Sequence, residues 1–134
     1  MSATDATQQI ITGVDFMGVP THDVERACEF YGTTLGLPRS AYVPERGYAE
    51  FETGNLTISV YDMTKMGMEH IALRNPIALH VDDIEAARSE LQRRGVTFGA
   101  PTFDTGVCHM AFFDDPDGNA LMLHHRYAPR TAEA

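Results

Sequence analysis

Residues 107–125, VCHMAFFDDPDGNALMLHH, decide the fold. Two apolar runs, residues 110–113 and 120–123, flank the polar segment DDPDGN. Pro116 presets the φ angle of an early turn position, Gly118 tolerates a positive φ, and Asp and Asn side chains bond to nearby backbone groups. This pattern predicts a β-hairpin.

Strand alternation sorts the side chains of this hairpin between two faces. The two leucines of the second run share a face that suits packing under a helix, whereas Met122 and His124 point to the opposite face. Met110 and Phe112 join them there if the two strands pair in the expected register. Function is therefore sought on the face opposite the helix.

Length and charge exclude several classes of function. The chain has 134 residues, enough for one domain with its own core, and its formal net charge is −9. Nucleic acid and anionic membrane surfaces are therefore not expected partners. The polar N-terminus does not predict a signal peptide, and Cys28 and Cys108 are isolated, which favours reduced thiols and a cytoplasmic location.

The first half of the chain predicts a strand, a helix and three strands. Residues 14–21 form the first strand, and Asp23 is placed to cap a helix. An apolar stripe at i, i+3, i+4, i+7 and i+11 starts at Val24 and ends at Leu35, and Gly36 follows it. The three further strands are expected near residues 40–43, 48–52 and 56–62.

The second half repeats this order after an aperiodic linker at residues 63–75. A strand is expected at 76–81, and Asp82 with Glu85 suggests a capping box for a helix that ends at Gly95. Strands near residues 97–98, 108–113 and 120–125 complete the set. The segments GVPTHDVERA and ALHVDDIEAA align at an offset of 60 residues.

The repeat predicts an α+β fold of two tandem βαβββ modules within a single domain, residues 1–134. Module one spans about residues 14–62, the linker residues 63–75, and module two about residues 76–127. A module of this size buries little alone, whereas two modules can share one core. We expect a curved mixed sheet with a central groove and with the helices on the outer face.

Three segments resemble the vicinal oxygen chelate superfamily, which includes glyoxalase, bleomycin resistance protein and extradiol dioxygenase. They are DVERACEFYGTTLGL at 23–37, HVDDIEAARSELQRRGV at 80–96 and FFDDPDGNALML at 112–123. The resemblance covers about residues 14–127 and implies the paired-module fold. It does not by itself imply one chemistry, because this fold hosts unrelated activities.

The resemblance also implies where a metal would be held. Enzymes of the superfamily bind a divalent ion through His or Glu in the first and last strands of each module. The matching positions here are Phe16, Thr57 or Ser59, Pro76 and Met122. Fe, Mn, Ni and Zn require imidazole, carboxylate or thiolate ligands. The family metal is therefore predicted to be absent, and no cofactor is predicted.

The groove face combines apolar walls with a few polar groups, as small-molecule pockets do. The predicted ligand-binding residues are Phe16, Tyr48, Ser59, Tyr61, Met110, Phe112 and Met122. The alternative is a groove filled by its own side chains, since Met and aromatic residues also fill cores.

His80, His124 and Glu50 are the predicted polar anchors and candidate catalytic residues. The two imidazoles are expected on one face, where they could form an acid–base pair or a relocated site for Fe, Mn, Ni or Zn. The alternative is ordinary groove-lining histidines.

Three functions remain open on the sequence alone. The first is a glyoxalase/bleomycin-resistance-like protein that binds a small molecule without the metal, and the second is a lyase, isomerase or dioxygenase-type enzyme. The third is a partner-binding module without a ligand. A homodimer is expected, because the sheet edges need covering.

Overall fold

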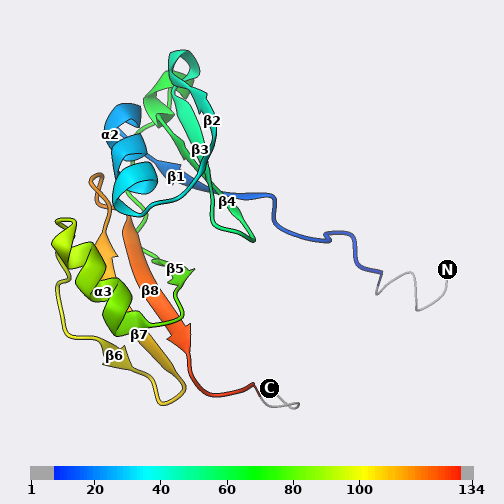
Figure 1. Ribbon diagram of the computed structural model, residues 1–134. Helices are drawn as coiled ribbons and strands as arrows, with labels where there is room; N and C mark the ends of the chain where they lie inside the picture. The colour runs from blue at the N-terminus through cyan, green and yellow to red at the C-terminus, as the bar shows by residue number, and fades with distance from the viewer. Residues whose placement is uncertain (1–7, 131–134) are drawn as a thin grey trace.

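Two four-stranded sheets, each packed on one face against a helix, make up the computed structural model, which describes residues 8–130 (Figure 1). The elements are β1 (Phe16–Pro20), α2 (Val24–Cys28), β2 (Arg39–Val43), β3 (Tyr48–Glu52), β4 (Thr57–Tyr61), β5 (Ile77–His80), α3 (Ile84–Arg93), β6 (Phe103–Asp104), β7 (Cys108–Asp114) and β8 (Ala120–Arg126).

The two sheets have the same topology. Sheet A has the order β1-β4-β3-β2 and sheet B the order β5-β8-β7-β6. In each sheet the first strand runs parallel to its neighbour, and the remaining pairs are antiparallel. The predicted α+β fold of two βαβββ modules is therefore confirmed. Within residues 8–130, no helix is long and apolar enough to cross a membrane.

The first helix begins and ends where the sequence predicts, but it widens on the way. The Asp23 carboxylate caps it by accepting a hydrogen bond from the Arg26 N–H at 3.1 Å. After α2 the chain continues as a π-helical turn, Glu29–Thr34. The Leu35 N–H donates to the Phe30 carbonyl, and Gly36 then takes a φ of 76°. Glycine adopts this left-handed conformation without the Cβ clash that other residues meet.

Two predictions for the second module are wrong. Asp83, not Asp82, caps α3 and accepts the Ala86 N–H at 3.0 Å. Both aspartates suit a cap, and the sequence does not show which one directly precedes the first helical turn. No strand forms at residues 97–98, because Phe98 packs against Phe113 with ring centroids 5.2 Å apart. The outermost strand is the two-residue β6 instead.

The two modules share one hydrophobic core. Phe30 of module one lies 6.5 Å from Phe113 of module two, measured between ring centroids. Val19, Phe51 and Leu121 are also fully buried in this core. The helix-side faces of both sheets therefore pack together.

The DDPDGN turn is the polar joint between the modules. Buried Asp115 accepts hydrogen bonds from the Tyr31 hydroxyl at 2.7 Å and from the Asn119 amide at 2.8 Å. Asn119 also donates to the Pro20 carbonyl and accepts from the Leu73 N–H, both at 2.8 Å. A turn that the sequence identifies locally therefore also holds β1 and the linker.

Asp117 makes the second half of this joint. Its carboxylate accepts from the Thr21 hydroxyl, from the His22 N–H at 2.8 Å and from the Arg26 guanidinium at 2.8 Å. Burial opposes ionisation of Asp117, but these hydrogen bonds and the Arg26 charge outweigh it and lower the pKa of the carboxyl. Asp117 is therefore a charged partner for α2.

Candidate functional site

The surface of sheet B opposite α3, called the sheet B face below, collects aromatic, Met and basic side chains. The strand register places its residues in rows. One row holds Ala78, Met122 and Phe112, the next holds His80, His124, Met110 and Phe103, and the last holds Arg126 and Cys108. The predicted register of the hairpin is confirmed by this pairing.

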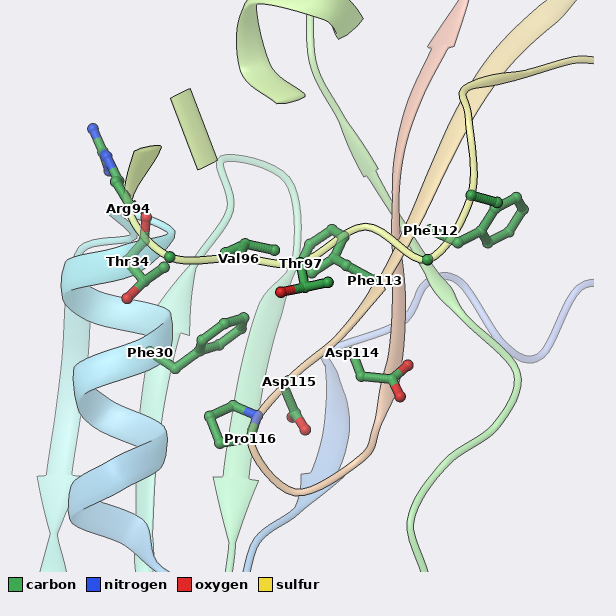
Figure 2. Close-up of a pocket in the computed structure, with 13 residues that line it drawn as sticks. Phe30, Thr34, Arg94, Val96, Thr97, Phe112, Phe113, Asp114, Asp115 and Pro116 are labelled. Carbon is green, nitrogen blue, oxygen red and sulfur yellow. Dashed lines mark hydrogen bonds between the residues drawn. The ribbon is translucent and has the colours of Figure 1, made fainter. Parts of the chain in front are cut away.

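Several apolar side chains on the sheet B face remain open to solvent. Phe112 is 38% exposed and Phe103 55% exposed, whereas Phe113, on the other face of β7, is only 4% exposed. Figure 2 shows Phe113 pointing toward Phe30, while Phe112 points away from it. Among residues 8–130, therefore, no part of the chain buries the aromatic rings of this face.

The two predicted histidines are direct register partners. His80 on β5 pairs with His124 on the parallel strand β8. The His80 Nε2 atom lies 3.0 Å from the Asp82 Oδ1 atom, and the ring is strongly exposed. Glu50 belongs to sheet A, and within the described part of the chain no hydrogen bond or salt bridge joins it to either imidazole. A catalytic role for the three residues stays a prediction.

The other predicted ligand-binding residues lie on the matching surface of sheet A, called the sheet A face. Phe16 is 55% exposed, Ser59 is buried, and Tyr48 pairs with Tyr61. The Tyr61 ring covers Gly18, where a Cβ atom would stand 2.8 Å from the tyrosine Cε1 atom. A side chain at position 18 would therefore displace the Tyr61 ring.

The predicted site residues are thus divided between two sheets. A cavity of about 240 Å³ lies over the sheet A face, between Tyr61 and the linker. This cavity and two larger ones, of about 690 and 640 Å³, are each lined by the open face of at most one sheet.

Two larger cavities lie mainly on the helix sides of the sheets, although Phe112 lines the first and Ala78 and His80 line the second. One of about 690 Å³ lies where the π-helical turn, the loop after α3 and the DDPDGN turn meet (Figure 2). The other, of about 640 Å³, lies between the modules on their helix sides. Its walls are mostly aliphatic and include Met17, Ile58, Leu79 and Leu91. This second cavity is an alternative location for an apolar ligand.

The residues at the family's metal positions do not fit a divalent ion. Phe16 and Thr57 are register partners, and Met122 pairs with Ala78 two residues after Pro76. None of these residues offers imidazole or carboxylate, and Ser59 supplies only a hydroxyl. Residues 8–130 contain no group of three or more His, Cys, Asp or Glu side chains placed to hold a metal.

Two residues of the sheet B face were not predicted. Phe103 lies on β6, and a two-residue strand carries no readable alternation. Arg126 continues the alternation of Met122 and His124 along β8, so the sequence did contain a signal for it.

Two βαβββ modules around one core, each leaving one sheet face open, define a vicinal-oxygen-chelate type of fold. The chain belongs to the Glyoxalase/Bleomycin resistance protein/Dioxygenase superfamily, whose family model matches residues 13–123.

Similar proteins include an uncharacterized protein and two proteins with solved structures, one of which is an antibiotic binding protein. The uncharacterized protein YraH of Bacillus subtilis (strain 168) is 27% identical, over 77% of this chain and 90% of its own. A glyoxalase/bleomycin resistance protein/dioxygenase from Nocardioides has a TM-score of 0.76 at 22% identity, covering 96% of this chain and 95% of its own. TnmS3, an antibiotic binding protein from Streptomyces sp. CB03234, has a TM-score of 0.76 at 30% identity, covering 89% and 99%.

Proposed function

We propose that the protein binds a flat, largely apolar small molecule on the sheet B face, without the family metal. The observation that carries this proposal is the pair of exposed rings, Phe103 and Phe112, with the half-buried Met110 and Met122 beside them on the open face of sheet B. Soluble proteins rarely expose contiguous apolar surface unless it binds something. A ligand that covers these side chains gains hydrophobic and aromatic contacts.

The chemistry of the face suits an aromatic ligand. Phe103 and Phe112 offer rings for stacking, and the flexible Met110 and Met122 side chains adapt to irregular shapes. TnmS3, which shares 30% identity with this chain, is an antibiotic binding protein. That similarity supports an organic small molecule as the ligand.

We also propose that the protein is a homodimer in which the sheet A face contributes to the site. β1 and β5 each have only one neighbouring strand among residues 8–130, so each leaves one edge unpaired. A second chain on these edges would cover them. It would also bring Phe16, Tyr48 and Tyr61 of one chain toward the sheet B face of its partner.

The test is a thermal-shift screen with a panel of polycyclic aromatic compounds. A hit raises the melting temperature, because the ligand binds only the folded chain. Met122→Ala, on the sheet B face, abolishes most of that shift, whereas Met66→Ala, at an exposed position in the linker, leaves it unchanged. A panel without any shift, or an equal loss in both variants, overturns the proposal.

A further inference from the structure

Arg126 differs from the other arginines that contact acidic side chains or carbonyls. Arg26 pairs with Asp117, Arg94 with Glu90, and Arg88 donates to the Ala100 carbonyl. Arg126 has no carboxylate within salt-bridge distance among residues 8–130. Its single hydrogen-bond contact there is a weak one, from Nη1 to the Cys108 sulfur at 3.9 Å.

The Arg126 side chain is also partly removed from water. The residue is half-buried, and its Nε atom is buried without a hydrogen-bond partner in the described part of the chain. A buried guanidinium N–H that lacks a partner is costly, and a carboxylate on a bound molecule would satisfy it. The orphaned donor therefore indicates a missing acceptor.

One imidazole shares the face of this guanidinium. His124 precedes Arg126 by two residues on β8, so both side chains point to the same side. An imidazole offers at least one N–H donor. The Nε2 atom of His80, the register partner of His124, is already engaged by the Asp82 carboxylate at 3.0 Å. In a chain of net charge −9, Arg126 and His124 are therefore two donors at one end of an apolar face.

We infer that the ligand carries an anionic group, a carboxylate attached to its aromatic body, and that Arg126 binds this group with His124 as a neighbouring donor. This inference rests on the proposed function, because the aromatic body of the ligand is taken to pack against Phe103, Met110, Phe112 and Met122. Charge complementarity selects this occupant: the planar guanidinium accommodates a carboxylate through two parallel hydrogen bonds.

The experiment compares two probes of nearly equal shape, 2-naphthoate, which is an anion at pH 7, and 2-naphthamide, which is neutral. Dissociation constants are measured by fluorescence titration for the wild type, Arg126→Gln, Arg126→Lys and Arg46→Gln. Arg46 lies at an exposed position after β2, so its substitution removes the same charge away from the sheet B face.

The wild type is expected to bind 2-naphthoate more tightly than 2-naphthamide. Arg126→Gln raises the dissociation constant of 2-naphthoate at least about tenfold, the typical effect of losing one charge-assisted hydrogen bond. The same substitution leaves the dissociation constant of 2-naphthamide unchanged, which also shows that the variant folds. Arg126→Lys recovers part of the loss, and Arg46→Gln behaves as the wild type.

Each contrary result has a distinct meaning. If both probes bind with equal affinity and Arg126→Gln does not separate them, the anion site is wrong while the proposed function stands. If neither probe binds to the wild type, the proposed function fails as well. If Arg126→Gln instead changes the molar mass measured by light scattering without separating the probes, Arg126 binds a second copy of the chain, and the inference is overturned.

Discussion

Phe112 and Phe113 are adjacent in sequence, yet they serve opposite sides of sheet B. Phe113 packs against Phe30 and Phe98 in the shared core, and Phe112 lies on the open sheet B face. Strand alternation alone predicts this division. The sequence also predicted which face lies under the helix, because Leu121 and Leu123 share the face of Phe113.

Substitution of each phenylalanine separates stability from binding. Phe113→Ala lowers the free energy of unfolding by about 3–5 kcal/mol, because it leaves a cavity in the core. Phe112→Ala changes the free energy of unfolding by less than about 1 kcal/mol but lowers the affinity for an aromatic ligand. Urea denaturation and ligand titration check the pair. Equal stability losses in the two variants would show that Phe112 is also a core residue.

Asp117 gives the joint between the modules a defined pH dependence. Its pKa is lowered in the folded state, so the folded carboxyl binds fewer protons near pH 4 than the unfolded one. Its stabilisation is therefore present above the unfolded pKa, about 3.9, and is lost as the pH falls through the folded value.

Asp117→Asn is expected to cost about 1–3 kcal/mol at pH 7, through the loss of charge-assisted hydrogen bonds. The difference from the wild type shrinks below about pH 4. Urea denaturation across this range measures it, with Asp15→Asn as the exposed control. A difference that stays constant down to pH 2.5 would contradict the role of the charge.

At the residue scale, the sequence predicted which side chains share a face of the sheet wherever the strand alternation was regular. His80 and His124 were expected on one face of the sheet, and they are direct register partners. Phe103 was missed, because its place depends on pairing with β7, whereas Arg126 was missed although alternation along β8 indicated its face.

At the scale of elements, the DDPDGN hairpin has two roles. The sequence predicts its turn, because Pro, Gly and Asx residues act locally. Its contacts with β1 and the linker join residues up to 99 positions apart, and no local pattern reports them. The same limit explains β6, whose position is set by pairing with β7.

Asn119→Ala tests the second role of the hairpin. It removes the partners of the Pro20 carbonyl and the Leu73 N–H, so the free energy of unfolding falls by about 2–4 kcal/mol. Asn55→Ala, in the exposed turn between β3 and β4, is the matched control and changes stability by less than about 1 kcal/mol. Chemical denaturation with similar losses in both variants would refute an inter-module role.

At the scale of the whole molecule, the repeat predicted two modules and one core, and both are confirmed by the shared topology. The relation between the two open faces was not predictable, because it depends on how separate sheets pack. The segment before β1, residues 8–15, also has a feature that local pattern does not predict. Its apolar side chains Ile10 and Ile11 are 91% and 77% exposed, so the described part of the chain does not cover them.

The proposed homodimer makes a direct prediction for this segment. Light scattering at micromolar concentration gives twice the mass of the 14.8 kDa chain. The double substitution Ile10→Ser and Ile11→Ser shifts the mass toward the monomer, because it removes apolar surface that a partner would bury. A monomeric wild type would contradict the proposal.

The location of the ligand tests the central claim most directly. Methyl-labelled methionines provide reporters on the sheet B face, Met110 and Met122, and in the aliphatic cavity on the helix side, Met17. Titration with 2-naphthamide, followed by NMR, is expected to shift the Met110 and Met122 methyl signals and to leave the Met17 signal in place. A shift confined to Met17 would place the ligand between the modules and contradict binding on the open sheet.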